Sequence, residues 1–429
     1  MTYTEHKIEE LKECADLSKD KYEYYFPKKR DNQLCFSAWK EKEDEFYKIR
    51  TGYFIGVDWI EENIKYINIQ PKVNFDKSGN IIREVDYLKM LFSCLKHNET
   101  AKLISDLIIV KWDNPQIEIE QKHDMLTPFI IIDFLNIVKI IVKKGLKKSY
   151  YKITKTLNGK IKGKMLIKKT MNIHLSKGHM LYNVCTYDEF GINNKENKIL
   201  KLALEYINQY MLSSPLMQDA YVVSDIVRNV SPAFEQVSSD IDVGEIKQMK
   251  SNTLFREYDN GIRLAKMILK RFAYNISNTA KRKIFTPPFW IDMPMLFELH
   301  VLSLLKDSFS ENDVDYHLST HGNELDFLLK AENCKMVIDA KYIPSWKWNV
   351  IHDNVRQISG YARLTKVYNS LSIEYPESID CLVIYPDIEN GKESIIKDGL
   401  KKDMEAVKGY QGFFKLGVKI PIISNGQNE

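Results

Sequence analysis

The segment between residues 323 and 342 constrains this chain most, because it places charged residues inside an otherwise apolar strand. It reads NELDFLLKAENCKMVIDAKY, which is typical of a strand, a short polar turn and a second strand. In the second strand, alternation with a period of two puts Asp339 and Lys341 on one face. An ionised aspartate and a lysine are costly to bury unless partners compensate their charges. A divalent cation and a phosphate would supply both partners.

The first of these two strands adds a second carboxylate. Asp326 lies on the strand face that also carries Glu324 and Leu328. If the two strands pair as a hairpin, Asp326 and Asp339 converge on one point. Hard oxygen ligands of this kind suit Mg²⁺, which keeps several waters and also takes phosphate oxygens. We therefore expect the two aspartates to bind one metal ion.

Helical segments before and after this pair of strands supply further polar side chains. The first reads PMLFELHVLSLLKDSF and carries Glu298 among its apolar positions, where a carboxylate needs a partner. The second reads NVRQISGYARL and places Gln357 and Tyr361 one turn apart, and the short buried strand CLVIYP follows it. Phosphodiester hydrolysis requires a metal ion at the phosphate, an activated water and a cation near that water. Lys341 fits the last of these roles.

The order of these residues resembles the core of PD-(D/E)xK nucleases. It is more closely similar to the McrC family, the nuclease subunits of McrBC-type, modification-dependent restriction systems. Four further segments carry the resemblance, namely GYFIGVDWIEENIKYINIQPKV, GLKKSYYKITKTLNGKIKGKMLI, CTYDEFGINNKENKILKLAL and DMPMLFELHV. The similarity runs, with gaps, from about residue 50 to about residue 390. Leu325 stands where the superfamily name has proline, and the second acid is Asp, two variations that are common in the superfamily.

The resemblance implies a role for each candidate site residue. Asp326 and Asp339 would be metal ligands, assisted by the backbone carbonyl of Ala340, and Lys341 would be the catalytic lysine. Two further members of the catalytic site would be Glu298 and Gln357. The implied cofactor is Mg²⁺.

The resemblance also implies a function and a partner. The chain would be the endonuclease subunit of a GTP-dependent restriction system that defends against phage and other foreign DNA, and it would hydrolyse phosphodiesters in double-stranded DNA. Its partner would be a hexameric, McrB-like AAA+ GTPase, which the chain stimulates. GTP would bind to that partner, because this chain has no phosphate-binding loop. The nearest candidate, Gly159–Met165, has one residue too few between its glycines.

Length and patterning predict how the chain is divided. Its 429 residues are enough for two or three domains, and helical and alternating segments both occur, so we expect an α+β or α/β multidomain fold. Helices are predicted over 129–142, 191–215 and about 260–276. The expected parts are an N-terminal partner-docking domain (1–165) that is β-rich around 50–75 and helical over 85–145, a connecting region of helices and strands (166–283), and a PD-(D/E)xK endonuclease domain with a mixed central sheet flanked by helices (284–429).

Positive charge is concentrated in one stretch, although the net charge is only +4. No acidic residue stands between Asp133 and Asp188, whereas thirteen lysines do, from Lys139 to Lys177. Such a stretch attracts polyanions and releases counterions when it binds one. It can also be a solvated face that acids elsewhere in the fold neutralise. The stretch would contact either DNA or the partner.

The remaining features bear on location and on alternative functions. Six scattered cysteines without a C-x-x-C pair, a charged N-terminus and the lack of a bilayer-long apolar run favour a cytoplasmic protein with no membrane partner. Two other functions stay open. One is a free-standing PD-(D/E)xK nuclease without a motor, which would cut without any nucleotide. The other is a non-catalytic, DNA-binding scaffold subunit, in which Asp326, Asp339 and Lys341 would fail to converge.

Overall fold

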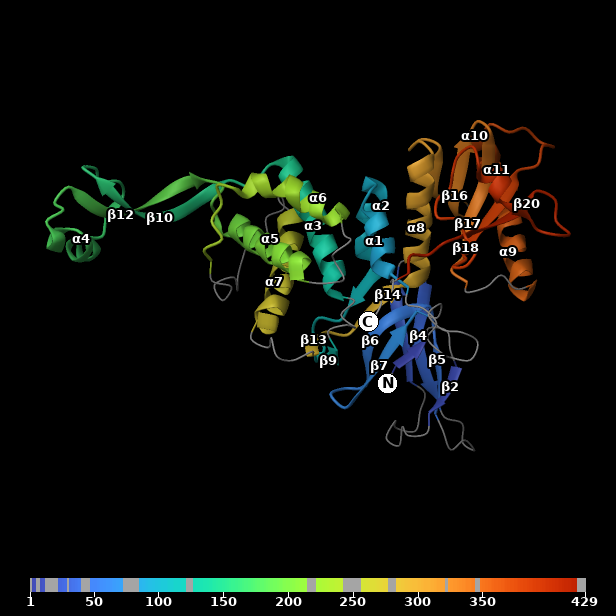
Figure 1. The fold of residues 1–429 in the computed structure, drawn as a ribbon, viewed down its shortest axis with the longest axis horizontal. Coiled ribbons are helices and arrows are strands. Elements are labelled where there is room, and N and C mark those ends of the chain that lie inside the picture. The colour runs from blue at the N-terminus through green and yellow to red at the C-terminus, as the bar shows by residue number, and fades with distance from the viewer. Residues whose placement is uncertain are drawn as a thin grey trace, which may run out of the picture. The chain divides into compact units, whose positions relative to one another are not determined.

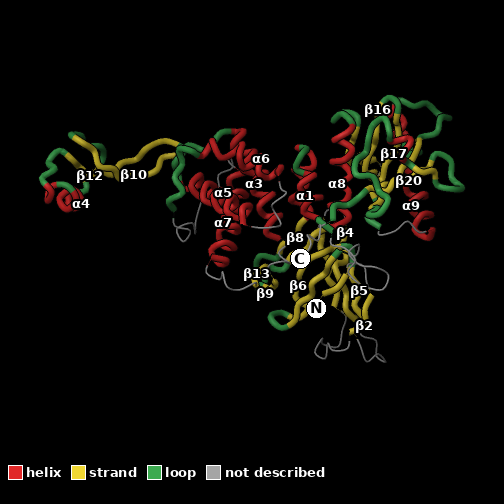
Figure 2. Tube along the Cα trace, viewed as in Figure 1, coloured by secondary structure: helices red, strands yellow, loops and turns green. Residues whose placement is uncertain are grey.

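The chain forms several separate sheets and groups of helices (Figures 1 and 2). The structure, a computed structural model, describes residues 2–4, 8–11, 22–28, 31–39, 47–71, 85–120, 126–213, 221–241, 256–276, 283–320, 323–343 and 348–422. This mixture of helices and sheets agrees with the expected α+β or α/β class. That the C-terminal part has a PD-(D/E)xK core stays a prediction.

By compactness the chain divides into two units. Unit 1 consists of Met1–His123 together with Phe285–Glu429, and unit 2 consists of Asp124–Ile284. Unit 1 therefore joins the two ends of the chain, and unit 2 is the segment between them. The division into three domains that we expect from the sequence stays a prediction.

The N-terminal strands of unit 1 belong to two sheets. The strands of the four-stranded sheet are, in order, β2 (Ile8–Leu11), β5 (Tyr47–Thr51), β4 (Asp31–Trp39) and β3 (Tyr22–Lys28). The strands of the five-stranded sheet are, in order, β1 (Thr2–Thr4), β7 (Lys65–Gln70), β6 (Phe54–Glu61), β14 (Phe289–Asp292) and β8 (Ile108–Val110). The β-rich region expected around 50–75 is confirmed by β6 and β7.

β14 enters this sheet from the C-terminal half of the sequence. It pairs with β6 on one side and with β8 on the other, and all four of its residues are buried. The backbone of β14 passes so close to Gly56 that a Cβ atom there would lie 2.1 Å from the carbonyl oxygen of Phe289. The buried carboxylate of Asp58 accepts a hydrogen bond of 2.8 Å from Nε1 of Trp290 and pairs with Nζ of Lys111 at 2.7 Å. The N-terminal sheet is thus complete only when β14 is part of it.

The region expected to be helical over 85–145 is helical only in part. The helices are α1 (Tyr87–Cys94), α2 (Asn98–Leu103), the 3-10 turn η2 (Ile104–Leu107) and α3 (Leu126–Lys144). Two strands, β8 and β9 (Ile117–Glu120), separate η2 from α3, so the continuous helical prediction was wrong there. The reason is local, because Ile-Ile-Val is a β-branched run and Ile-Glu-Ile-Glu alternates strictly, and both patterns favour strands.

Unit 2 contains a group of helices and a ribbon of strands. Its helices are α3, α5 (Lys195–Ser213), α6 (Tyr221–Val230) with the 3-10 turn η6 (Ser231–Phe234), and α7 (Arg256–Ile276). α7 packs against both α3 and α5. The helices predicted over 129–142, 191–215 and 260–276 are confirmed by α3, α5 and α7. Within the described ranges, no helix combines the length and the apolar character that crossing a membrane requires.

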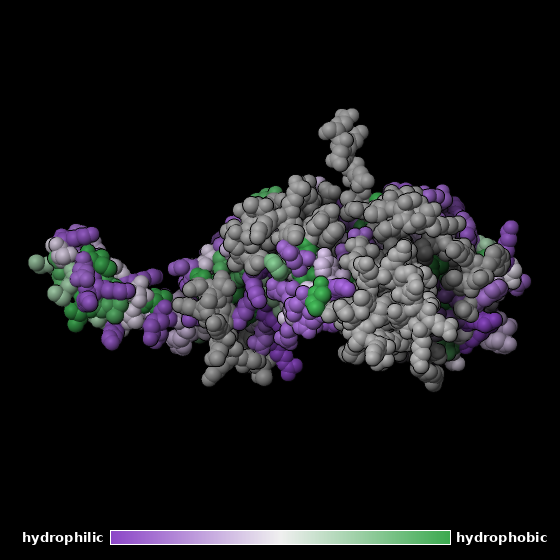
Figure 3. All heavy atoms as spheres, turned by 90° about the horizontal axis from the view of Figure 1, so that it is seen from below, coloured by the Kyte–Doolittle hydropathy of each residue, from purple (hydrophilic) through white to green (hydrophobic). Residues whose placement is uncertain are grey.

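The ribbon of unit 2, residues 149–191, is called the arm below (Figure 1). β10 (Ser149–Asn158) and β12 (Tyr182–Gly191) pair antiparallel along their whole lengths, and β11 (Lys164–Met165) pairs with β12. Between β11 and β12 lie α4 (Ile167–Ile173) and the 3-10 turn η4 (Leu175–Lys177). Figure 3 shows apolar and hydrophilic side chains together on the surface of the outer part of the arm. Asn197 secures the base, because its side-chain amide donates to the carbonyls of Lys147 and Ile192 at 3.0 and 2.7 Å.

The C-terminal part of unit 1 is built on a six-stranded mixed sheet. Its strands are, in order, β15 (Val314–Thr320), β16 (Asn323–Ala331), β17 (Cys334–Ala340), β18 (Asp380–Pro386), β20 (Phe413–Val418) and β19 (Glu405–Ala406). β15, β16 and β17 are antiparallel to one another, whereas β17, β18 and β20 are parallel. The two predicted strands of the 323–342 segment and the buried strand CLVIYP are therefore confirmed.

The helices of this part are α8 (Met293–Ser308), α9 (Trp348–Tyr361), α10 (Thr365–Leu371) and α11 (Leu400–Asp403). α8, α9 and α10 contact strands of the sheet. Leu328 and Val337 of the sheet share one apolar cluster with Val355 and Ile358 of α9 and Val367 of α10. α8 contacts β15 and β17. This packing brings α8 and α9 next to the strands that carry the predicted site.

Candidate active site

Asp326 and Asp339 lie side by side on neighbouring strands. β16 and β17 are antiparallel with Phe327 opposite Ile338, so Asp326 and Asp339 are the next residues along the ladder. Oδ2 of Asp326 accepts a hydrogen bond of 2.9 Å from the backbone N–H of Ala340. Asp339 is only 1% exposed. The structure thus brings together the two carboxylates that strand alternation placed on one face.

Lys341 directly follows β17 and contacts both β17 and α9. Its Nζ atom lies 2.9 Å from Oδ2 of Asp339 and donates a hydrogen bond of 3.3 Å to Oε1 of Gln357. Nε2 of Gln357 in turn donates to the hydroxyl of Tyr361 at 2.8 Å. α9 presents these last two side chains together because they are one helical turn apart. The four side chains form a continuous series of polar contacts.

Burial and mutual repulsion change the protonation of this cluster. Burial, together with the charges of Asp339 and Glu298, raises the pKa of Asp326 well above its usual value. Burial also raises the pKa of Asp339, although Lys341 opposes this effect. Burial alone would lower the pKa of Lys341, but Asp339 and Asp326 beside it raise that pKa on balance. The site therefore holds more negative charge than its lysine neutralises.

The available ligands fit a hard divalent cation. Oδ1 of Asp339 is buried and has no hydrogen-bond partner among the described residues, and a cation would satisfy it. Within the described ranges, no three or more His, Cys, Asp or Glu side chains could enclose a metal ion by themselves. Two carboxylates suffice for Mg²⁺, because this ion usually keeps several waters. Asp326 and Asp339 therefore suit magnesium, and the part of the Ala340 carbonyl stays a prediction.

Glu298 reaches the edge of the site from α8, where a histidine holds it. Its Oε1 atom lies 2.5 Å from Nε2 of His317 on β15. The other ring nitrogen of His317, Nδ1, lies 3.4 Å from Oε1 of Glu324. His317 is thus the partner that a carboxylate among the apolar positions of a helix requires. No spacing motif identifies His317 in the sequence, because its two partners stand on another strand and on a helix.

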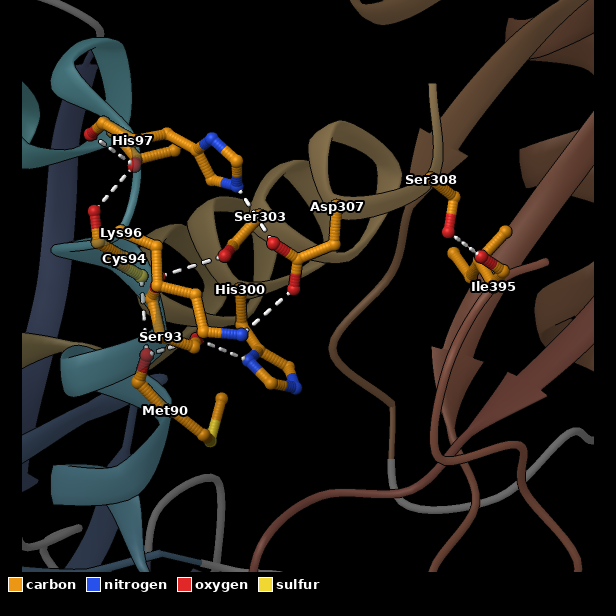
Figure 4. A network of polar contacts seen from close by, with 11 residues as sticks. Met90, Ser93, Cys94, Lys96, His97, His300, Ser303, Asp307, Ser308 and Ile395 are labelled. Atoms are coloured by element: carbon orange, nitrogen blue, oxygen red, sulfur yellow. Dashed lines mark hydrogen bonds and ion pairs between the residues drawn. The ribbon is translucent and has the colours of Figure 1, made fainter. Parts of the chain in front are cut away.

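A separate polar network ties α8 to α1 and α2 (Figure 4). Nδ1 of His300 hydrogen-bonds with the hydroxyl of Ser93 at 2.8 Å, and the hydroxyl of Ser303 donates to the carbonyl of Ser93 at 2.8 Å. Asp307 accepts hydrogen bonds from Lys96 and His97 at 2.8 and 2.9 Å. Burial, with the charge of Lys96 adding to it, lowers the pKa of His300 to about 4. Hydrogen bonds to Ser93, Lys96 and His97 therefore hold α8, the helix that carries Glu298, against α1 and the start of α2.

Comparison with known proteins identifies one family. The model of the family described as "McrBC 5-methylcytosine restriction system component" matches residues 49–370. No curated protein matches the chain. A refined half-complex from a tetradecameric assembly of Thermococcus gammatolerans McrB AAA+ hexamers with bound McrC is similar at 13% identity and a TM-score of 0.38, covering 100% of this chain and 96% of that chain. The cryo-EM structure of the Thermococcus gammatolerans McrBC complex is similar at 14% identity and a TM-score of 0.28, covering 74% and 88%.

Proposed function

This chain belongs to the family of McrBC 5-methylcytosine restriction system components, and on that basis we propose that it is the DNA endonuclease subunit of such a system. It would hydrolyse phosphodiesters of double-stranded DNA with Mg²⁺, in a restriction system that depends on GTP. The observation that carries this proposal is the convergence of Asp326, Asp339 and Lys341 where the pairing of β16 with β17 ends. The mixed sheet from β15 to β18, with α8 and α9 beside it, supports a PD-(D/E)xK core.

Each residue of the cluster has a distinct part in the proposed reaction. Asp326 and Asp339 would hold the magnesium ion, with the carbonyl of Ala340 assisting. The chemistry that such an ion would supply is polarisation of the scissile phosphate and a lower pKa of a water molecule. The carboxylates of Asp339 and Asp326 raise the pKa of Lys341, which favours its protonated form. In that form its ammonium group would orient the attacking water and offset charge in the transition state.

Gln357 and Glu298 complete the proposed site from the two flanking helices. Gln357 fixes the position of the Lys341 ammonium group through its carbonyl oxygen, and Tyr361 fixes the amide of Gln357. The charge of Glu298 acts on Asp326 and Asp339. Glu298 therefore affects how strongly the acid pair attracts a cation.

The nuclease proposal is tested by Mg²⁺-dependent DNA cleavage with the wild type and with Asp339→Ala. Each protein is assayed with and without the AAA+ GTPase and GTP. The matched control is Glu405→Gln, which removes a 72% exposed carboxylate that pairs with Lys415 on the same sheet. We expect cleavage by the wild type and by the control, and none by Asp339→Ala. Equal cleavage by all three proteins would overturn the site assignment.

The same assay separates the two alternatives. Cleavage only with the GTPase and GTP supports the motor-dependent subunit, whereas cleavage without them supports a free-standing nuclease. A scaffold without activity was expected to show no convergence of Asp326, Asp339 and Lys341. The contacts of these three residues count against it.

We also propose that the partner is a hexameric, McrB-like AAA+ GTPase and that the arm contacts it. Part of the arm lies in the range 1–165, which the sequence assigned to partner docking. The arm exposes large apolar side chains, among them Tyr150 at 76%, Ile161 at 65%, Met180 at 80%, Leu181 at 67% and Phe190 at 58%. Exposed apolar surface of this kind is typical of a protein interface, whereas DNA binding relies on charge. We therefore infer that the lysine-rich stretch, which runs into the arm, contacts the partner rather than DNA.

A cytoplasmic location is part of the same proposal. The five cysteines in the described part of the chain, Cys35, Cys94, Cys185, Cys334 and Cys381, are free and buried. Free buried thiols suit a reducing compartment.

A further inference from the structure

His317 has an unusual place in the C-terminal sheet. In the ladder between β15 and β16, Tyr316 faces Phe327 and Leu318 faces Leu325, so His317 lies opposite Asp326. His317 itself leaves the ladder, because its φ of 54° is in the left-handed region. A residue other than glycine rarely adopts this conformation unless its surroundings impose it.

The contacts of the His317 ring explain why the backbone of His317 adopts the left-handed conformation. One ring nitrogen lies 2.5 Å from Glu298 and the other 3.4 Å from Glu324. The ring also stacks on Tyr316, with 3.6 Å between the ring centroids. His317 thus links a carboxylate of α8 to a carboxylate of β16, and only 17% of its side chain is exposed.

We propose that His317 is a positioning residue that holds the Glu298 carboxylate beside the Asp326–Asp339 pair and thereby sets the metal affinity of the site. The proposal rests on the proposed function, because it assigns His317 to the same site. Glu298 contacts His317, which lies opposite Asp326 in the ladder of β15 and β16, so the charge of Glu298 lies near the acid pair. Moving Glu298 away would reduce the negative charge that a cation meets. Groups that orient a metal site from outside commonly change metal affinity by about 10–100-fold when removed.

The left-handed backbone offers a clean way to remove the ring. Glycine adopts a positive φ without strain, so His317→Gly loses the imidazole while the backbone keeps its path. Asparagine also tolerates this region and carries an amide donor, so His317→Asn is the conservative variant. Asn63 has nearly the same backbone conformation, with a φ of 62°, in the turn between β6 and β7. Asn63→Gly therefore controls for the effect of glycine on the backbone alone.

The experiment measures Mn²⁺ binding to the full chain by calorimetry, the Mg²⁺ concentration for half-maximal DNA cleavage, and the melting temperature. We expect His317→Gly to weaken Mn²⁺ binding by about tenfold or more. The half-maximal Mg²⁺ concentration should rise in parallel, while cleavage at saturating Mg²⁺ falls less. His317→Asn should recover part of the affinity. Asn63→Gly should match the wild type, whereas His317→Gly should stay folded but melt at a lower temperature, because Glu298 loses its partner.

Wild-type Mn²⁺ affinity in a folded His317→Gly protein would overturn the proposal. So would a melting temperature that falls in both His317 variants while metal affinity stays normal, because that shows a purely structural role. Asp339→Ala distinguishes this failure from failure of the proposed function. If the wild type binds Mn²⁺ no better than Asp339→Ala, the metal site itself is wrongly assigned. If Asp339→Ala loses Mn²⁺ affinity but the His317 variants keep it, the metal site is correctly assigned and His317 does not position it.

Discussion

At the scale of single residues, the contact between Lys341 and Asp339 stabilises a charge that the fold buries. Lys341→Met removes the ammonium group and keeps a side chain of similar length. We expect the cleavage rate to fall at least about hundredfold, because no cation then offsets charge in the transition state. The metal-free protein should also be less stable, since Asp339 loses its ion pair. Cleavage assays and urea denaturation with and without Mn²⁺ measure both effects.

A second lysine on the same sheet gives the matched control for this prediction. Lys415 pairs with the exposed carboxylate of Glu405 at 2.8 Å, and exposed pairs contribute little to stability. Lys415→Met should leave the cleavage rate unchanged. Similar cleavage rates for the two lysine variants would show that Lys341 has no special part in the reaction.

The crowded acid pair predicts a pH dependence of stability. Because folding raises the pKa of Asp326, its ionised form destabilises the metal-free fold. This loss is absent at and below about pH 4, where the unfolded chain also binds the proton, and it develops as the pH rises through the folded-state pKa. Metal-free Asp326→Asn should therefore be more stable than the wild type at pH 7, and the difference should vanish toward pH 4. Urea denaturation in EDTA at several pH values tests this, and a difference independent of pH would contradict it.

At the scale of elements, the close approach of β14 to β6 makes Gly56 essential. Gly56→Ala should lower the free energy of unfolding by about 3 kcal/mol, because a Cβ atom would collide with the backbone of β14 and its φ of 149° disfavours other residues. Gly360→Ala is the control, since nothing lies within 4 Å of its Cβ position in α9. It should raise stability by roughly 0.5–1 kcal/mol. Urea denaturation followed by tryptophan fluorescence compares the two, and equal effects would contradict the packing described here.

Two double variants of the arm can distinguish contact with the partner from contact with DNA. Met180→Ser with Leu181→Ser removes exposed apolar side chains, so the stability of the chain should change by less than about 0.5 kcal/mol. Stimulation of the partner GTPase should be lost, because the apolar contact area is gone. Lys168→Ser with Lys169→Ser, also on the arm, is the matched pair that removes charge. GTP hydrolysis and the salt dependence of DNA binding are measured for both double variants.

The two double variants have different expected outcomes. If the arm contacts the GTPase, the apolar pair loses stimulation and the lysine pair keeps most of it. If the arm contacts DNA, the lysine pair instead lowers the slope of affinity against salt by about 0.9 for each lost phosphate contact. A normal GTPase response in the apolar variant would show that the arm is not the docking element.

At the scale of the whole molecule, the sequence predicted what depends on local periodicity. Alternation over 323–342 was enough to expect a hairpin with Asp326 and Asp339 on one face, and the register of β16 and β17 has this form. Helical spacing was enough for α5 and α7. These features follow from the spacing of apolar side chains within one element, which a single sequence contains.

Features that depend on distant segments could not be predicted in this way. The pairing of β14 with β6 and β8 joins segments that are far apart in the sequence, and a strand of only four residues does not identify its neighbours. His317 was passed over for the same reason, because its partners are on α8 and β16. The strands β8 and β9 are a different case, because their own residues favour strands and only their shortness, three and four residues, hid them within a region of helical spacing. The combination of both chain ends in unit 1 depends on tertiary contacts.

The position of β14 has a consequence for how the protein is made in the cell. When the first 123 residues have emerged from the ribosome, four strands of the five-stranded sheet exist, but β14, which lies between β6 and β8, does not. The exposed edges of β6 and β8 stay open to wrong pairing until residue 292 has emerged. Unit 2 is complete in sequence before that point, so it can fold first during synthesis. The strand that completes the five-stranded sheet leads directly into α8, so the part of the chain that builds the six-stranded sheet begins where the five-stranded sheet is completed.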